Sequence, residues 1–203
     1  MPGDQGTRTL ILILAVSGFA SSFGMRIADP LVAEIARDLS TDPRTIALMA
    51  TAFALPYAFI QPILGPVSDA VGKERIIKGC LAILALAIAG SALARDPATL
   101  LALRVLAGVS AGGIIPASLA LIGDRVALEG RHLAISRFLV AIILGQLSGA
   151  SVSGLIAQLV SWRGVFVLAG GVTAAALVLF LRSAPPAPPP SRFSPKLALE
   201  RYR

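Results

Sequence analysis

The stretch GPVSDAVGKERIIKG, residues 65–79, is a polar interruption between two long apolar segments. FALPYAF lies a few residues before it, and CLAILALAIAG follows it directly. Its charged residues are Asp69, Lys73, Glu74, Arg75 and Lys78. Glycine and proline in such a stretch indicate a turn. The pattern therefore predicts a charged loop that joins two membrane-spanning helices.

Composition places the chain in a lipid bilayer. Of its 203 residues, 56% are hydrophobic and only 14% are charged, and the mean hydropathy is +0.81. Soluble domains carry about a quarter charged residues. A helix needs about 20 apolar residues to cross roughly 30 Å of hydrocarbon, and this chain has several such runs. Barrel strands need only about 10 alternating residues, so the run length favours helices.

Charge, cysteine content and the first apolar run argue against three other kinds of protein. The net charge is +7, but the bases fall in short connectors without interleaved aromatic residues, so we expect no nucleic acid as partner. Cys80 is the only cysteine, which excludes an internal disulfide, and we expect no metal site. We expect no cleavable signal peptide, because Arg26 and Asp29 follow LILILAVSGFASSF in place of a cleavage site.

The apolar runs predict an all-α polytopic membrane protein with six transmembrane helices. We place these helices at residues 9–30, 45–65, 76–94, 98–122, 134–159 and 164–182. Residues 1–183 would form one six-helix bundle. Residues 184–203 are Pro-rich and basic, and we expect a cytoplasmic tail or a truncated central linker there.

The bases in the connectors predict the orientation of the bundle. One side of the membrane would hold Arg8, Lys73, Arg75, Lys78, Arg125, Arg131, Arg137 and Arg182, with Arg192, Lys196, Arg201 and Arg203 of the tail. The other side would hold Arg26, Arg37, Arg44, Arg95 and Arg163. Short loops rich in Lys and Arg stay in the cytoplasm. Both termini are therefore expected there, and the location would be the bacterial inner membrane.

Polar side chains divide the six spans into two kinds. The third and sixth spans carry little beyond Ser91 and Thr173, so we expect them to face lipid. The other four carry several polar residues each and would line a polar space. The order polar, polar, apolar occurs twice, which predicts two inverted three-helix repeats. GPVSDAVGKERII also resembles GLIAQLVSWRGVF, residues 154–166.

The charged loop resembles the signature Gly-x-x-x-Asp-(Arg/Lys)-x-Gly-(Arg/Lys)-(Arg/Lys) between helices two and three of the major facilitator superfamily. The matching residues are Gly65, Asp69, Gly72 and Lys73. Ala70 and Glu74 stand where that family has a base, and Arg75 supplies a cation one residue later. We expect Gly65 to permit close helix approach and Gly72 to permit a positive φ.

This resemblance implies that Asp69, Lys73 and their neighbours latch one conformation and release it as two halves of a transporter rock. An ordinary charged loop that obeys the positive-inside rule is the alternative interpretation. GDRVALEGRHLA, residues 123–134, also looks like the family's loop between helices four and five, with Asp124 and Arg131 at the expected places. SWRGVF resembles the Trp-Arg pair before helix six, where Trp162 equally suits an interfacial anchor.

RVLAGVSAGG, residues 104–113, is similar to the family's Arg-x-x-x-Gly-x-x-x-Gly pattern in helix four. The matching residues are Arg104, Gly108 and Gly112. A guanidinium within an apolar run needs a partner or water. Asp29 and Glu34 are the expected partners, and Arg26 competes for them. Two interpretations stay open: a charge relay or substrate-coupled switch, and a structural ion pair.

GQLSGASVSG, residues 145–154, resembles the Gly-x-x-x-Gly-Pro-x-x-Gly-Gly stretch of antiporters in the superfamily. Gly145, Gly149 and Gly154 match it, whereas Ala150 replaces the proline and Ser153 replaces a glycine. The match favours efflux by antiport. Plain packing of two helices through small residues would leave the same pattern.

The resemblance covers residues 8–182, which correspond to half of the family's usual twelve helices. It implies secondary-active transport of a small organic solute by alternating access. We expect a homodimer of half-transporters, because a copy of the chain would supply the absent half. The alternatives are an N-terminal half that is inactive alone, with its C-terminal half missing, and a membrane scaffold that transports nothing.

Mildly polar residues among apolar ones predict an amphipathic solute. The candidate substrate-binding residues are Ser17, Ser21, Met25, Tyr57, Gln61, Ser110, Gln146 and Ser151. Each of them taken singly also suits a hydrogen bond between helices. No cofactor is expected; a proton is the candidate coupling ion, carried by Asp29 or Glu34 beside Arg26.

An enzyme is the rival of a different class. An intramembrane serine protease needs a serine and a histidine that meet inside the bundle, but the only histidine, His132, lies in a basic connector. His-Glu-x-x-His does not occur in the sequence, and the one Gly-x-Ser-x-Gly match, residues 108–112, lies inside the fourth apolar run. We therefore expect no catalysis.

Overall fold

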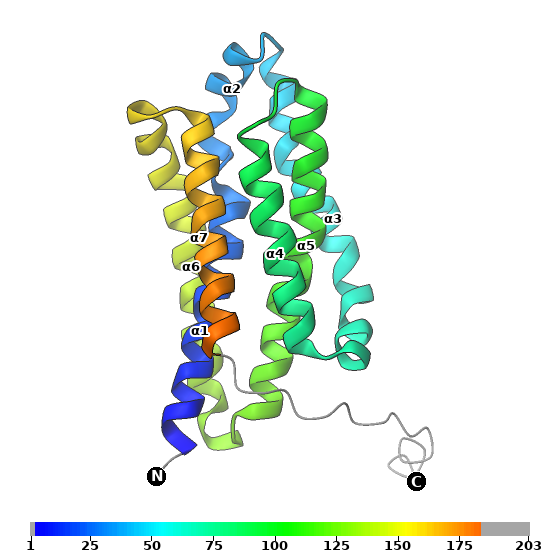
Figure 1. Cartoon of the computed structure of the whole chain (residues 1–203), viewed down its shortest axis with the longest axis vertical. Helices are drawn as coiled ribbons and strands as arrows, with labels where there is room; N and C mark the ends of the chain where they lie inside the picture. Colours follow the sequence, from blue (N-terminus) through cyan, green and yellow to red (C-terminus); the bar gives the residue numbers. More distant parts are fainter. Residues whose placement is uncertain (1–2, 184–203) are drawn as a thin grey trace.

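The computed structural model describes residues 3–183, which are helical almost throughout (Figure 1). The elements are α1 (Gly3–Arg26), η1 (Asp29–Leu31), α2 (Val32–Asp38), α3 (Pro43–Val71), α4 (Lys73–Ser91), α5 (Pro97–Arg125), α6 (Leu128–Leu159) and α7 (Trp162–Ser183). The predicted tail over residues 184–203 lies outside the described residues. The prediction of an all-α fold is confirmed.

Six long helices run roughly parallel or antiparallel along one axis (Figure 1). Helices α4 and α7 lie side by side and cover α5 and α1, respectively. Helix α3 packs on α5 at one edge, and α6 packs on α1 at the other. Helix α1 begins and α7 ends at the same end of the bundle, which we call the terminus end; the other, with α2, is the opposite end.

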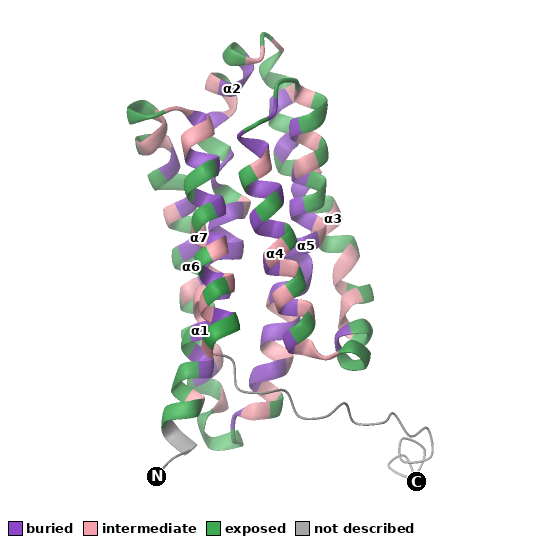
Figure 2. Ribbon diagram, viewed as in Figure 1, coloured by how far each residue is buried: buried purple, intermediate pink, exposed green. Residues whose placement is uncertain are grey.

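Burial follows from this arrangement, because helices with neighbours on two sides bury more residues. Buried residues concentrate on α1, α4, α5 and α7, where these helices face one another (Figure 2). Among the five helical segments that are long and apolar enough to cross a membrane, those of α3 and α6 have the smallest buried share. Large apolar side chains such as Phe59 and Leu147 lie exposed on them. An exposed apolar surface of this extent requires lipid or another protein to cover it.

Five segments within the described residues are long and apolar enough to cross a membrane. These are Gln5–Asp38, Pro43–Val71, Pro97–Arg125, Leu128–Leu159 and Trp162–Ser183. The predicted third span corresponds to α4, which has 19 residues and carries Lys73, Glu74, Arg75 and Lys78 near its start. These charges occupy the first two turns of a helix that is already short for a membrane.

The loop predicted between the second and third spans, residues 66–75, is wrong, because all of it except Gly72 is helical. Helix α3 continues to Val71 and α4 begins at Lys73, so the turn is the single residue Gly72. Gly72 has φ +106°, which disfavours any side chain with a Cβ. A loop was expected because glycine and proline indicate a turn, but Pro66 lies inside α3 and Gly72 alone separates the two helices.

The first connector begins earlier than predicted, and the next long helix, α3, begins at Pro43 rather than at residue 45. The first helix ends at Arg26 rather than near residue 30, and the connector holds the short helices η1 and α2. Asp42 caps the start of α3, where its carboxylate accepts a hydrogen bond from the Arg44 backbone amide. Asp96 caps the start of α5 in the same way and accepts from the Thr99 backbone amide. Such caps fix where α3 and α5 start.

Helix α3 differs from its neighbours in carrying Pro56, Pro62 and Pro66 in its interior. A proline has no N–H, so the carbonyl four residues earlier loses its helical donor.

Helices α4 and α7, which we expected to face lipid, each bury one face and expose another. Leu81 and Leu84 of α4 are buried, whereas Leu86 is 73% exposed.

Candidate functional site

An ion-pair cluster at the terminus end brings the predicted latch together. The Lys73 ammonium lies 2.8 Å from Asp69 Oδ1, one turn earlier across Gly72, and 2.8 Å from Asp124 Oδ2 at the end of α5. Only 18% of the Lys73 side chain is exposed, whereas Asp69 and Asp124 are more than half exposed. One cation thus joins α3, α4 and α5.

The two carboxylates stabilise the charged form of Lys73. Hydrogen bonds from its ammonium to Asp124 and Asp69 raise the pKa of Lys73 above the ordinary value of 10.5. A raised pKa in the folded protein means that the stabilisation is fully present below the ordinary value. It is lost only as the pH rises through the higher folded value. At neutral pH Lys73 is therefore charged and can pair with both carboxylates.

A second ion pair beside the first was not predicted from the sequence. Arg125 Nη2 lies 3.0 Å from Glu74 Oε1, and the Glu74 side chain is only 7% exposed. Glu74 stands where the family signature has a base, and the structure gives this departure a partner. The sequence holds a clue to this pair, because Lys73 and Glu74 are adjacent and so are Asp124 and Arg125. If Lys73 pairs with Asp124, then Glu74 can pair with Arg125.

Three other latch-region residues differ in their contacts. Arg131 donates to the carbonyls of Gly123 and Val126 at 2.6 and 3.3 Å, so it closes the turn between α5 and α6. Arg75 is exposed and forms no ion pair within the described residues. A methyl group at Gly65 would meet nothing within 4 Å, so the prediction that Gly65 permits close helix approach is wrong for contacts within this chain.

Arg104, predicted to need a partner inside the membrane, is buried to 1% exposure. Its Nη1 donates to the Gly24 carbonyl at 3.0 Å and its Nη2 to the Met25 carbonyl at 2.9 Å. Its guanidinium also lies 4.6 Å from the centre of the Phe53 ring. The last carbonyls of a helix lack helical donors and carry partial negative charge, so Arg104 caps the C-terminus of α1.

The expected pairing of Arg104 with Asp29 or Glu34 is therefore wrong. Asp29 is 3.2 Å from Arg26, so the predicted competition by Arg26 is confirmed. Glu34 accepts a hydrogen bond from the Trp162 backbone amide at 2.9 Å. All three coupling candidates lie near the opposite end of the bundle, at or beyond the end of α1.

Glycines of two predicted patterns hold helices in close contact. A methyl group at Gly112 would lie 2.7 Å from the Tyr57 carbonyl oxygen, and one at Gly108 would clash with Phe53. A methyl group at Gly149 would lie 2.6 Å from the Phe23 carbonyl oxygen, and one at Gly145 would clash with the Phe19 carbonyl oxygen. Gly154 approaches Pro30 less closely. The pattern on α5 therefore packs against α3, and the pattern on α6 packs against α1.

The substrate-binding candidates divide by exposure. Ser17, Ser21 and Ser110 are buried inside the bundle, so these three do not line an open cavity in this structure. Ser17 and Ser110 donate to carbonyls one turn earlier in their own helices. The accessible candidates are Met25, Tyr57, Gln61, Gln146 and Ser151.

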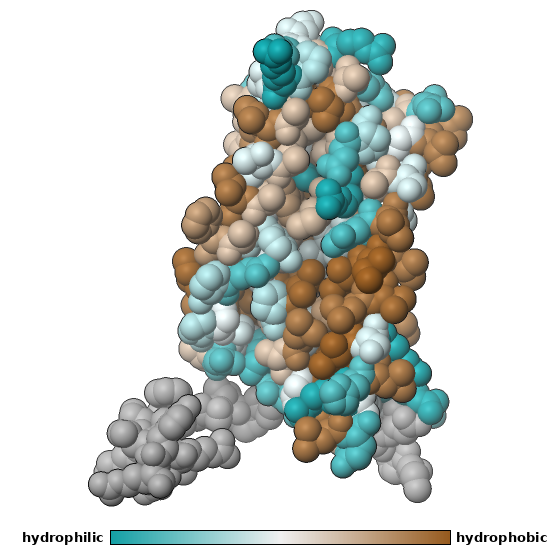
Figure 3. All heavy atoms as spheres, turned by 180° about the vertical axis from the view of Figure 1, so that it is seen from behind, coloured by the Kyte–Doolittle hydropathy of each residue, from teal (hydrophilic) through white to brown (hydrophobic). Residues whose placement is uncertain are grey.

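The face opposite α4 and α7 combines apolar and polar surface. Figure 3 shows apolar residues over much of its middle, polar residues at both ends and a polar streak that runs into its upper half. On α3, Tyr57 and Gln61 are one turn apart, and both are half-buried. The same helix therefore presents a phenol and an amide next to its contact with α5.

A further polar cluster, at the opposite end, was not predicted. The Trp162 indole N–H donates to Asp38 at 3.1 Å, and Arg163 pairs with the same carboxylate. Arg163 also donates to the Ala94 carbonyl at 3.1 Å and stacks 4.2 Å from the Trp162 ring. The Trp-Arg pair thus ties α2, the α4–α5 connector and the start of α7 together.

Comparison with known proteins was made once this geometry was established. The family model of the Major Facilitator Superfamily matches residues 14–201. The chain belongs to this superfamily. It is 30% identical over 186 residues to the MFS efflux transporter aclA of Aspergillus oryzae, which covers 88% of this chain and 33% of that protein. It is 27% identical over 183 residues to a bicyclomycin resistance protein homolog of Haemophilus influenzae, covering 89% of this chain and 46% of the relative.

The fold also matches solved structures. A bacterial homolog of the human lysosomal transporter Spinster, in an inward-facing and unoccupied conformation, superposes with a TM-score of 0.77 at 17% identity. The match covers 94% of this chain and 46% of that structure. The inward-facing and occupied conformation gives a TM-score of 0.75. The chain thus spans less than half the length of the relatives and structures it matches.

Proposed function

We propose that this membrane protein is one half of a secondary transporter that moves a small amphipathic organic solute by alternating access, as an efflux antiporter. The observation that carries the proposal is the Lys73 bridge, which joins three helices through exposed carboxylates at one end of the bundle. A cluster of that kind can be exchanged for other contacts when two halves rock. The names of the relatives, an efflux transporter and a resistance protein homolog, support the direction of transport.

We also propose six membrane spans built as two inverted repeats, with α4 as the third span. In this arrangement α1 corresponds to α5, α3 to α6 and α4 to α7. The contact of α3 with α5 then corresponds to the contact of α6 with α1. The contact of α4 with α5 likewise corresponds to that of α7 with α1. The bases gathered at the terminus end support an orientation with that end in the cytoplasm of a bacterial inner membrane.

A second six-helix unit is required to close a transport path, and we propose that a copy of this chain supplies it. The exposed apolar surfaces of α3 and α6 support a partner, since these helices bury least. The shorter span of the chain relative to its relatives supports the second candidate, in which a different C-terminal half completes the transporter.

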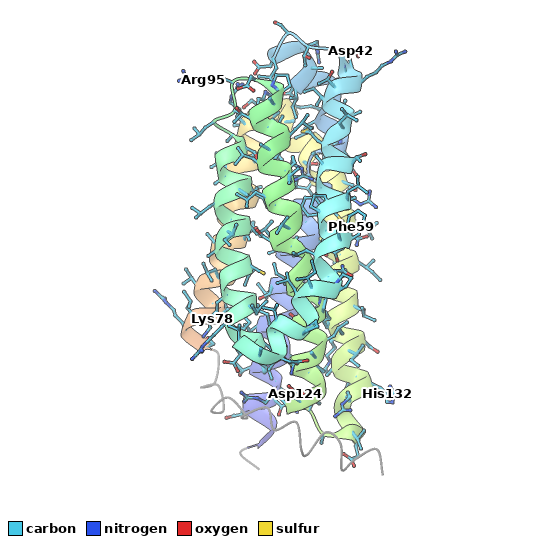
Figure 4. All side chains as sticks on the ribbon, turned by 90° about the vertical axis from the view of Figure 1, so that its right-hand side faces the viewer. Asp42, Phe59, Lys78, Arg95, Asp124 and His132 are labelled. Atoms are coloured by element: carbon cyan, nitrogen blue, oxygen red, sulfur yellow. The ribbon has the colours of Figure 1, made fainter. Side chains whose placement is uncertain are left out.

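The substrate would contact the accessible polar residues rather than the buried serines. Tyr57, Gln61 and Gln146 supply hydrogen-bonding groups among apolar neighbours, which suits an amphipathic solute. A proton is the proposed coupling ion. Asp29 and Glu34 are its candidate carriers, and each already has a partner from which protonation would release it. No catalytic role is proposed; His132 is exposed at the terminus end (Figure 4).

Two measurements on the purified chain test the proposal. Native mass spectrometry in lipid nanodiscs gives the oligomeric state, and proteoliposomes with an imposed pH gradient give efflux of a panel of amphipathic dyes that includes ethidium. We expect a dimer, dye transport, and loss of transport in Asp69→Asn and Arg104→Ala. A monomer without transport would instead favour a missing half. A dimer that transports no dye would favour a scaffold.

A further inference from the structure

Three cations near the terminus end of α4 and α7 have no carboxylate partner. Lys73 is held by Asp69 and Asp124, and Arg125 pairs with Glu74. Arg75, Lys78 and Arg182 form no ion pair within the described residues. The three neighbouring carboxylates Asp69, Glu74 and Asp124 are thus occupied, and within residues 3–183 no carboxylate pairs with the three remaining cations.

These cations lie where two adjacent helices end together. The Lys78 ammonium of α4 is 5.7 Å from the centre of the Phe180 ring of α7, so it contacts the neighbouring helix. Figure 4 places Lys78 beside the last turn of α7. Arg182 follows Phe180 by two residues and is exposed. The positive charge therefore belongs to a shared edge of two helices rather than to one loop.

An exposed apolar stripe continues from the cations along α4. Positions 75, 79, 83 and 86 repeat at spacings of three and four residues, so they lie on one side of the helix. Gly79 is exposed and a methyl group there would meet nothing within 4 Å, so the surface beside the cations is open at this position. Beyond it Ile83 is 44% exposed and Leu86 is 73% exposed. Charge at one end and apolar surface above it match the two parts of a phospholipid.

We propose that this α4–α7 edge binds an anionic phospholipid of the leaflet at the terminus end. Arg75 and Lys78, with Arg182 beside them, would hold the phosphate and the negative headgroup. One acyl chain would lie along Gly79, Ile83 and Leu86. Basic pockets between transmembrane helices on the cytoplasmic side recognise such headgroups. The site requires only that the protein lies in a membrane, so a protein that transports nothing would still have it.

Native mass spectrometry of the detergent-purified chain, titrated with phosphatidylglycerol or phosphatidylcholine, tests the proposal. We expect bound phosphatidylglycerol to persist at collision energies that remove phosphatidylcholine. Each cation near a membrane surface contributes about five-fold to the binding of anionic lipid, so Arg75→Gln with Lys78→Gln should weaken binding roughly 30-fold. Lys78→Arg should keep most of it.

The matched control is Arg137→Gln on α6, which removes one exposed positive charge from the same end of the bundle but from a different helix. It should leave phosphatidylglycerol binding within about two-fold of wild type, since the charge near a membrane acts over a Debye length of about 8 Å. Equal weakening by Arg137→Gln and by Lys78→Gln would overturn the site and indicate bulk charge attraction. Unchanged binding in the double variant would overturn it directly.

Discussion

At the scale of the residue, Arg104 shows that a cation buried in a helical bundle can be stabilised without a carboxylate. Its two nitrogens meet the Gly24 and Met25 carbonyls, which lie in the last turn of α1. These carbonyls have no helical donor, and the helix dipole makes that end of α1 negative. The guanidinium suits the task because its planar fork reaches both oxygens at once.

Replacing Arg104 by methionine should destabilise the fold even when no transport is measured. Hydrogen bonds that involve a charged group contribute about 1.5–3 kcal/mol each, and the two carbonyls would be left buried without donors. We expect Arg104→Met to lower the midpoint of thermal unfolding in detergent, with Arg104→Lys intermediate because an ammonium cannot span both oxygens.

Ser118→Ala is the matched control for that change. The Ser118 hydroxyl is buried and has no hydrogen-bond partner among the described residues. Its removal should leave the melting temperature unchanged or raise it, since no bond is lost. A melting temperature of Arg104→Met equal to wild type would contradict the capping role.

The need of Arg104 for a partner could be read from the sequence, but the partner could not. Its position within an apolar run was sufficient to predict burial. The choice of Asp29 or Glu34 assumed that the first helix continues to residue 30, in which case the Gly24 and Met25 carbonyls would be hydrogen-bonded within it. Because α1 ends at Arg26, those oxygens are free to accept from Arg104.

At the scale of the element, the bundle is built on two close contacts between helix backbones. Glycines four residues apart on α5 and on α6 approach the carbonyls of aromatic residues on α3 and α1, respectively. Each of those helices carries a stacked aromatic pair, Phe53 with Tyr57 and Phe19 with Phe23, at centroid distances near 6 Å. The spacing of the glycines predicted helix packing from sequence; which helix receives them depends on the tertiary arrangement.

The one-residue turn at Gly72 gives a prediction for the α3–α4 pair. Its φ of +106° lies where a Cβ is strained, so Gly72→Ala should destabilise the protein by about 1–3 kcal/mol. It should also separate Asp69 from Lys73 and reduce dye efflux in proteoliposomes. Melting temperature and efflux rate, measured on the same preparation, check both effects.

Gly65→Ala is the control within the same helix. An added methyl group meets nothing within 4 Å, and alanine is a better helix former by about 0.5–1 kcal/mol, so stability should rise slightly. If Gly65→Ala destabilised the protein as much as Gly72→Ala, the positive φ at Gly72 would not explain the loss of stability in Gly72→Ala. Normal stability with lost efflux would place Gly65 against the second half of the transporter.

At the scale of the whole molecule, the two ends differ in their chemistry. The terminus end holds the Lys73 bridge and the unpaired cations of α4 and α7, whereas the opposite end holds the Trp162–Arg163 cluster around Asp38. Within residues 3–183 the bases lie at the ends to which the sequence assigned them, since connectors between apolar runs must alternate sides. Sequence reasoning missed the cluster around Asp38, because η1 and α2 fold the connector back onto α7.

The proposed orientation predicts which end reacts with a reagent that cannot cross the membrane. With Cys80 replaced by serine, single cysteines at Arg95 and His132 lie exposed at opposite ends (Figure 4). In intact cells an impermeant maleimide should label Arg95→Cys and spare His132→Cys until the membrane is opened. Labelling of both from outside would contradict a bundle that crosses the membrane, and the reverse pattern would invert the orientation.

The prolines of α3 give the ion-pair cluster a mechanical property. Without amide donors at Pro56, Pro62 and Pro66, the carbonyls of the preceding turns are not tied to the ladder, and such helices bend with little loss. Asp69 follows the last of these prolines by less than one turn. Asp69, one of the two carboxylates that Lys73 binds, therefore lies just beyond three positions at which the helix can bend, and its distance from Lys73 depends on that bending.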